Sequence, residues 1–240
     1  MTEDQGPRDG FYRFVPTKFG NLTKGKLQML GVKNDKSFQA NVGHSVGDVF
    51  PAIWVDIPDP DPKNAEDSPS EVFKQGWNNG GAAFVGNEGM CITPDGRVFF
   101  AESDGGDAEL GQIWEYRPVN ANEGQLTLRY ESTGPADLDG PDNMAVSPRG
   151  KILLCEDGDE VDNFVKGLDP ATATLFPLVE NLVDVDLNIL DPGDFPPGSG
   201  TGRSEMAGAV FSADGRWLFV SVQIPGATYA ITGPWADLGI

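Results

Sequence analysis

Histidine and cysteine are scarce in this sequence, whose 240 residues include one histidine, His44, and two cysteines, Cys91 and Cys155. A lone histidine excludes a metal site built on two histidines and argues against a Ser-His-Asp triad. No partner motif surrounds His44, so we interpret it as a surface loop residue. The cysteines lie in apolar, strand-like runs without a Cys-x-x-Cys motif, and we expect buried thiols, not disulfides or zinc ligands. Any chemistry must therefore come from carboxylates and bound cations.

Positive charge is also scarce, with 17 Lys and Arg against 37 Asp and Glu and a net charge of −20. This balance argues against binding to nucleic-acid phosphates or to an anionic membrane surface. No run approaches the roughly 18 apolar residues of a membrane-spanning helix. Residues 1–30 lack the basic-then-apolar order of a secretion signal. We expect neither a nucleic-acid partner nor a membrane partner.

The composition favours a folded protein made of strands. Apolar residues make up 39% and aromatic residues 10% of the chain, which is enough for a core. The 31 glycines and 19 prolines favour many short strands joined by turns. Helix is predicted for at most one turn, near Ser70–Gln75.

A repeated hairpin is the most informative pattern. Runs beginning at Cys91, Met144 and Val210 each consist of an apolar strand, a tight turn ending in glycine and a second apolar strand. Sheets of four short antiparallel strands that recur at roughly 50 to 65 residues are typical of propeller blades. We predict an all-β fold, a partial β-propeller of four-stranded antiparallel blades, as a single incomplete domain over residues 1–240. A two-sheet β-sandwich is the alternative.

Two insertions interrupt this repeat. Residues 56–75 begin with an acidic, proline-rich connection that cannot form a central strand. Residues 184–203 are rich in glycine and proline and are predicted to form a second long loop. Long loops in compact domains are often binding loops or disordered, and the sequence leaves both open.

Acidic residues recur at matched places in the repeats. Glu88 and Asp142 each stand at the entry of a first hairpin strand, and Glu205 stands at a third entry if that copy has two extra residues or a bulge. The second strands end at Glu3, Glu102 and Glu156. Matched positions on the inner strands of a propeller converge on its axis, where carboxylates repel one another unless cations lie between them.

These acids predict a site for a hard cation. Ligand sets of oxygen alone favour Ca²⁺, with Mg²⁺, Mn²⁺ or ferric iron as further options. The neighbouring Asn87 and Asn143 add carbonyl oxygens. The competing interpretation is that these acids are solvated residues at strand ends, which a chain this acidic would have in any case.

Several motifs, in order along nearly the whole chain, resemble the PhoX-type alkaline phosphatases. The motifs are Phe11–Pro16, Leu22–Leu27, Glu88-Gly89, Gly105-Gly106, Gly111–Trp114, Pro141–Asn143, Cys155–Gly158, Phe211–Arg216 and Ala230–Trp235. The resemblance covers the C-terminal half of the family. It implies a β-propeller, exported to the periplasm, that hydrolyses phosphate monoesters at a site of iron and calcium ions.

The resemblance also implies roles for particular residues. Its metal ligands match Glu88, Glu156 and Glu205, with Glu3 as a fourth and Asp142, Asn143 and Asp157 as weaker candidates. Its iron-binding cysteine belongs to the upstream half, so neither Cys91 nor Cys155 inherits that role. Gly86 stands where members often carry an arginine suited to a phosphate oxygen, and Arg203 is the candidate substitute for substrate binding. No residue is assigned as catalytic.

The sequence therefore favours a metal-dependent phosphate-monoester hydrolase that acts on small-molecule phosphate esters. We expect a truncated chain that lacks part of the active site, with periplasmic or secreted location by resemblance. An open arc of blades exposes strand edges, so we also expect self-association or pairing with the missing N-terminal half.

Two alternatives remain open. Pro141–Gly150 resembles a blade start of calcium-dependent lactonases of the gluconolactonase kind. A non-catalytic propeller fragment that binds calcium is the other alternative.

Overall fold

The computed structural model describes residues 1–4, 8–63, 70–158, 162–186 and 201–240. The chain forms two compact units, Met1–Glu131 (unit 1) and Ser132–Ile240 (unit 2). Each unit is built from antiparallel strands, and each is described separately below.

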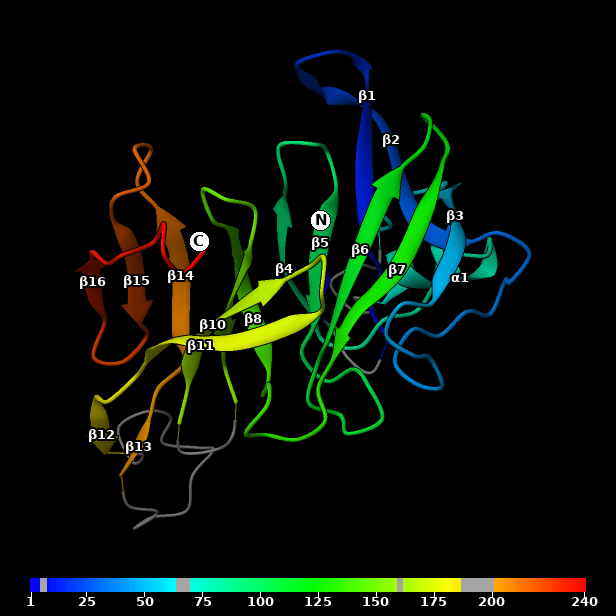
Figure 1. Ribbon diagram of the computed structural model, residues 1–240. Coiled ribbons are helices and arrows are strands. Elements are labelled where there is room, and N and C mark those ends of the chain that lie inside the picture. Colours follow the sequence, from blue (N-terminus) through cyan, green and yellow to red (C-terminus); the bar gives the residue numbers. More distant parts are fainter. Residues whose placement is uncertain (5–7, 64–69, 159–161, 187–200) are drawn as a thin grey trace. The chain divides into compact units, whose positions relative to one another are not determined.

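Unit 1 contains one seven-stranded sheet with the strand order β1-β2-β3-β7-β6-β5-β4 (Figure 1). Its strands are β1 (Tyr12–Lys18), β2 (Asn21–Val32), β3 (Val49–Asp56), β4 (Asn87–Ile92), β5 (Val98–Glu102), β6 (Gln112–Pro118) and β7 (Glu123–Glu131). Strands β4 to β7 form a four-stranded antiparallel set, as the repeat predicts. The sheet continues beyond this set because β3 pairs with β7, from Val49 opposite Thr127 to Ile53 opposite Glu123.

Aromatic side chains fill the core of unit 1. Trp114, Phe100 and Phe84 are completely buried. The ring of Phe11 stacks on Phe100 with centroids 4.4 Å apart. His44 also contributes, because its ring stacks on Phe38 at 4.9 Å and its Nε2 lies 2.9 Å from the carbonyl oxygen of Gln39. The histidine interpreted as a surface loop residue thus packs against the aromatic core.

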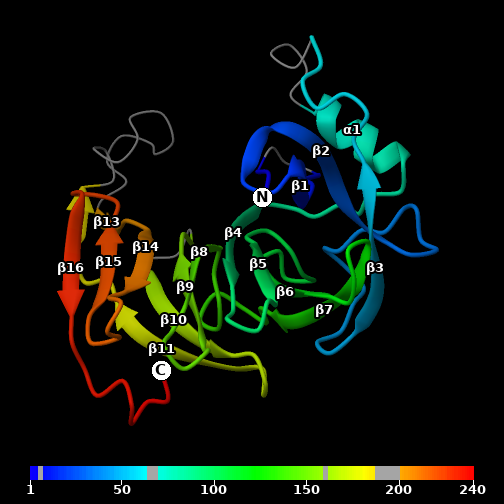
Figure 2. The same ribbon diagram turned by 90° about the horizontal axis from the view of Figure 1, so that it is seen from above.

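The described part of the chain has one helix, α1 (Glu71–Asn78), beside β2 and β3 in Figure 2. The expectation of a single turn here was too short. Phe73 and Gly76 are buried on one face of the helix, and the sulfur of Met29 occupies the space that a Cβ at Gly76 would need. Packing against β2 thus stabilises a second turn that local sequence alone does not favour.

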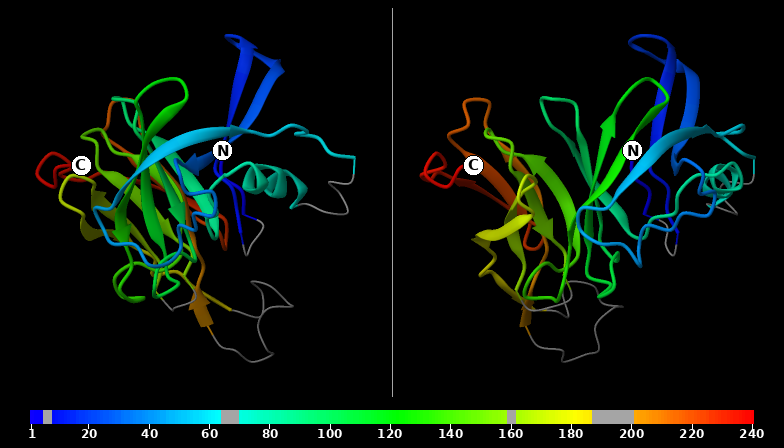
Figure 3. Two further views of the ribbon diagram at one scale, coloured as in Figure 1. Left: turned by 90° about the vertical axis from the view of Figure 1, so that its right-hand side faces the viewer. Right: turned by 45° about the vertical axis from the view of Figure 1, so that its right-hand side comes forward.

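The β1–β2 hairpin extends beyond the rest of unit 1 (Figure 3). Residues Lys18–Lys24 at its tip are exposed, and Phe19 is 99% exposed. A glycine is required in this turn, because Gly20 has a φ of +77°.

Unit 2 contains a four-stranded and a three-stranded antiparallel sheet, ordered β11-β10-β9-β8 and β14-β15-β16. Their strands are β8 (Pro141–Val146), β9 (Ile152–Glu156), β10 (Phe164–Asp169), β11 (Thr174–Glu180), β14 (Met206–Phe211), β15 (Leu218–Val222) and β16 (Ala227–Ile231). Leu153, Cys155 and Val165 of the first sheet pack with Met206 and Val220 of the second. The two sheets thus share one apolar core.

The insertion predicted at residues 184–203 begins and ends in a short ladder. Strand β12 (Asp184–Asp186) pairs antiparallel with β13 (Thr201–Arg203). Residues 187–200 lie outside the described residues, as do residues 64–69 of the first insertion. The described part of the first insertion consists of the proline-rich connection that follows β3 and of the beginning of helix α1.

The predicted fold class is confirmed, because the chain is nearly all β and propeller-like, with a four-stranded antiparallel sheet at β8–β11 as the clearest blade. All three predicted hairpins are present as β4–β5, β8–β9 and β14–β15. The description of every sheet as a separate four-stranded blade is refined in two places. Unit 1 joins its strands into seven, and the sheet that begins at β14 has three.

Each repeated hairpin has an irregularity in its first strand. The pairing shifts between Asn87 and Met90, between Pro141 and Met144, and between Ala207 and Val210. Such bulges change the direction in which a strand's side chains point and are common near functional sites. Glu88 lies within the first bulge, and Asp142 and Asn143 lie within the second.

Among the described residues, no helix is long and apolar enough to cross a membrane.

We predict that both cysteines resist thiol reagents in the folded protein. Cys91 and Cys155 are buried, and burial raises the pKa of each thiol to about 12, so the reactive thiolate is rare at pH 8. A chromogenic disulfide reagent should label neither cysteine in native protein and both in denaturant. Rapid labelling of either thiol without denaturant would show that its strand opens readily.

Candidate carboxylate site

Unit 2 brings three of the predicted ligands to one place. Asp142 lies in the bulge of β8, and Glu205 directly precedes β14, which packs against β8. The charges of Asp142 and Glu205 both act on the thiol of Cys155 and raise its pKa further. Two carboxylates from different strands therefore lie near one buried side chain.

Asn143 joins this group through hydrogen bonds. Its Nδ2 donates to Asp142 Oδ1 at 2.8 Å, and its Oδ1 accepts from the backbone N–H of Gly208 at 2.9 Å. These bonds tie the bulge of β8 to the bulge of β14. The group Asp142, Asn143 and Glu205 is called the unit 2 carboxylate group below.

The register of β14 places Glu205 differently from the prediction. Met206 lies opposite Val222 in the third hairpin, and Asn87 lies opposite Glu102 in the first, so Met206 and Asn87 are equivalent positions. The next residue in each strand is then also equivalent, and Ala207 matches Glu88. Glu205 thus stands just before the strand, and the bulge needs no two-residue expansion. The third hairpin has one more residue than the first, and this residue lies in its turn. The turn is closed by a bond from the Ser212 N–H to Trp217 O in the third hairpin, and by a bond from the Thr93 N–H to Arg97 O in the first.

Glu156, at the end of β9, is a buried and fully bonded carboxylate. It is 1% exposed, and its Oε1 lies 2.7 Å from Nζ of Lys166. The backbone N–H groups of Asp139 and Phe164 donate to its two oxygens, each at 3.0 Å. Burial raises its pKa and these partners lower it. This geometry favours a structural role, and a metal at Glu156 would have to displace Lys166.

The remaining predicted ligands are dispersed. Asp157 is exposed, and its backbone N–H donates to the Gly140 carbonyl. Glu3 and Glu88 belong to unit 1. One oxygen of Glu3 accepts bonds from the Tyr12 hydroxyl at 2.6 Å and from the Gly10 N–H at 3.0 Å, and burial raises its pKa.

Arg203, the candidate phosphate ligand, is engaged by carboxylates. Its Nη1 pairs with Asp162 and lies 3.4 Å from Glu180 Oε1, while its Nε lies 3.5 Å from Asp184 Oδ1. Three negative charges surround one positive charge, so the local field opposes a phosphate. Substrate binding by Arg203 would require these pairs to open.

Lys166 is the residue that sequence analysis missed. It is 4% exposed in β10, within a run that is otherwise apolar, and it is the charged partner of Glu156. A lysine in the middle of the segment Phe164–Asp169 was the signal available in the sequence. Across the described residues, no three His, Cys, Asp or Glu side chains form a group that could hold a metal ion. A cation in unit 2 would therefore need the carbonyl oxygen of Asn143 as well.

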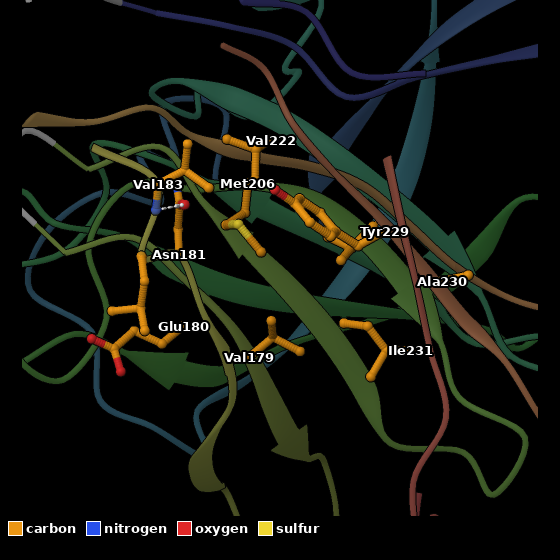
Figure 4. Close-up of a pocket in the computed structure, with 11 residues that line it drawn as sticks. Val179, Glu180, Asn181, Val183, Met206, Val222, Tyr229, Ala230 and Ile231 are labelled. Atoms are coloured by element: carbon orange, nitrogen blue, oxygen red, sulfur yellow. Dashed lines mark hydrogen bonds between the residues drawn. The ribbon is translucent and has the colours of Figure 1, made fainter. Parts of the chain in front are cut away.

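An apolar pocket of about 290 Å³ also lies in unit 2 (Figure 4). It is lined mainly by Val179, Met206, Val222, Tyr229 and Ile231. The Val183 N–H donates to Asn181 Oδ1 at its rim, at 2.9 Å. Its lining suits an apolar group and not a phosphate.

Comparisons with known proteins agree with the motifs. The family model described as alkaline phosphatase PhoX matches residues 1–226. A solved structure, Pseudomonas fluorescens PhoX in complex with vanadate, a transition state analogue, is 15% identical with a TM-score of 0.56. The match covers 92% of this chain and 47% of that one, so the chain spans about half the length of this relative.

A second solved structure, of a protein from Lactobacillus plantarum, is 15% identical with a TM-score of 0.36. That match covers 94% of this chain and 82% of the other. No curated protein sequence matches the chain.

We predict that Lys166→Met destabilises the protein by about 3–5 kcal/mol, because Glu156 would keep its buried charge without a partner. The matched control is Lys26→Met, which removes an exposed pair with Asp56 and should cost about 1 kcal/mol or less. Urea unfolding of the two variants measures the difference. Equal losses would mean that the Lys166–Glu156 pair contributes no more than a surface pair.

Proposed function

We propose that this chain, which belongs to the alkaline phosphatase PhoX family, supplies metal ligands to a site that hydrolyses small-molecule phosphate monoesters. The observation that carries the proposal is the family match over residues 1–226. The likeness to the P. fluorescens structure supports the same fold. Because the chain spans about half of that structure, we propose that its residues form one part of the site and not the whole of it.

The unit 2 carboxylate group is the best-supported place for a cation. Its donors are two carboxylates and one amide carbonyl, all oxygen, and this set suits Ca²⁺ better than a soft metal. The carbonyl of Asn143 accepts one bond from Gly208 and keeps a second lone pair for a ligand. Strands β8 and β14 hold these donors in place through the Asn143 bonds to both bulges.

Glu88 and Glu3 of unit 1 are proposed as cation ligands from the family motifs alone. Bound cations would polarise the phosphoryl oxygens and stabilise the charge that develops during transfer to water. The carboxylates themselves hold and orient the cations and carry no proton in this proposal. Iron in the family implies a cysteine ligand upstream, so calcium is the ion that we assign to this chain's residues. Export to the periplasm is proposed from the family alone.

The test combines metal analysis with an assay on the same sample. Purified chain should bind Ca²⁺ by itself. Hydrolysis of p-nitrophenyl phosphate with calcium and iron present should depend on added residues of the family's upstream half, and a chelator should abolish this turnover. The double variant Asp142→Asn, Glu205→Gln should lose one bound calcium ion per chain and about tenfold or more of the activity. Glu123→Gln, at an exposed carboxylate paired with Lys33, is the control and should behave as wild type.

Three outcomes would contradict parts of this proposal. Unchanged calcium content in the double variant would place the cation elsewhere. Hydrolysis of a lactone without hydrolysis of the phosphate ester would favour the lactonase reading of Pro141–Gly150. Calcium binding without turnover of either ester, even with the upstream residues added, would favour a non-catalytic binding role.

A further inference from the structure

Glu102, at the end of β5 in unit 1, is a buried carboxylate without a counter-charge. It is completely buried, and neither of its carboxylate oxygens has a hydrogen-bond partner. Burial raises its pKa well above the usual range, and the charges of Asp9 and Glu131 raise it further. The Val85 backbone and the Trp114 indole lie near enough to lower its pKa in part, but neither makes a hydrogen bond to Glu102 of normal geometry.

The other buried glutamates of the described chain show what Glu102 lacks. Glu115, 1% exposed, lies 2.8 Å from Nε of Arg129 and 3.4 Å from Nη1 of Arg97. Glu156 has Lys166. Each of these two carboxylates is neutralised by a basic side chain, and Glu102 is not. An uncompensated buried charge is among the costliest features that a fold can contain.

Comparison of the repeated hairpins shows which position holds a lysine in unit 2 and no basic residue in unit 1. Glu102 pairs with Asn87 as Glu156 pairs with Pro141, so the two glutamates occupy one position of the repeated hairpin. Lys166 lies opposite Leu154, and the matching residue opposite Phe100 is Trp114. The third copy has Val222 at the position of the glutamates and needs no cation. Unit 1 thus keeps the acid but replaces the lysine by an indole.

Other oxygens face the same place. Asn87 is 1% exposed, and because its Nδ2 donates to Gly10 O at 3.1 Å, its Oδ1 is left without a partner. A Cβ built at Gly105 would lie 2.6 Å from Glu102 Oε2 and 2.9 Å from Gln112 Oε1. The absence of a side chain at Gly105 therefore allows a carboxylate oxygen and an amide oxygen to lie close to the same point of its backbone.

Charge and geometry decide between a proton and a metal ion here. A proton on one oxygen of Glu102 can be donated to Asn87 Oδ1, which leaves the second carboxyl oxygen of Glu102 without a partner. A calcium ion accepts about six to eight oxygen ligands and could satisfy both Glu102 oxygens as well as Asn87 Oδ1, with Gln112 Oε1 and the nearby Asp9 completing its shell. Asp9 is itself fully buried and accepts the Gly86 N–H at 2.8 Å, which fixes its carboxylate in unit 1.

We propose that unit 1 binds a divalent cation of the calcium class between Glu102 and Asn87, with Gln112 and Asp9 as supporting ligands. The cation links the ends of β4, β5 and β6 with the segment before β1. It balances the charge of Glu102 in unit 1, as Lys166 balances the charge of Glu156 in unit 2. None of these four residues belongs to the candidate ligands of the proposed active site. The test of this cation site is therefore independent of the test of the phosphatase proposal.

Terbium binding and calcium-dependent melting test this site. The experiment uses the full chain with Asp142→Asn and Glu205→Gln, so that the unit 2 carboxylate group does not contribute. Trp114 lies beside Glu102, so Tb³⁺ at the site should give luminescence when tryptophan is excited, and Ca²⁺ should displace it. Adding Glu102→Gln should remove this signal and one bound ion per chain, and should abolish the rise in Tm that Ca²⁺ produces.

A second variant tests the site in the opposite direction. Asn87→Asp adds a charged ligand and should increase the affinity for Ca²⁺ by about tenfold or more, while lowering Tm in chelator. Glu123→Gln is again the control and should leave both readouts unchanged. If Glu102→Gln folds, as judged by circular dichroism, and binds as many ions as its parent, the proposal is wrong. If it does not fold, an unchanged affinity in Asn87→Asp overturns the proposal.

Discussion

A carboxylate buried at the end of a strand is stable as a charged group only beside a positive charge, and this constraint applies in both units. The repeated hairpin places a glutamate at the end of its second strand in two of three copies, where neighbouring strands cover it completely. In unit 2 the balance comes from Lys166 on the adjacent strand. In unit 1 the lysine position holds Trp114, and we propose that a cation from outside the chain takes the place of the lysine.

The bulges follow from the same hairpin. Each first strand loses its regular pairing near its start, which redirects the residues there. In unit 2 this brings Asp142 and Asn143 toward Glu205, and the Asn143 amide links the two bulges. In unit 1 it separates Glu88 from the strand pair of Asn87 and Glu102. The hairpin thus offers two kinds of carboxylate: buried ones at the ends of second strands and half-buried ones in the bulges of first strands.

This division changes how the family resemblance applies to single residues. Glu156 matches a ligand motif, but its two oxygens are occupied by Lys166 and two backbone N–H groups. Arg203 matches the need for a phosphate ligand, but three carboxylates surround it. Asp142 and Asn143, weaker by motif, lie in the better environment for a cation. The order of the candidate ligands by their match to the family motifs therefore differs from their order by the charges that surround them.

The sequence by itself determined the fold class and the hairpins, because alternating apolar strands and glycine turns are local signals. It also pointed to carboxylates as the chemistry-bearing groups, because one histidine and two apolar cysteines left few alternatives. Only the tertiary structure decided which acids meet. The pairing of β3 with β7, the second turn of α1 on Met29 and the place of Glu205 before β14 depend on contacts between distant segments. Whether a glutamate is a ligand or a partner of a lysine depends on the residue across the strand, and strand pairing across loops sets that neighbour.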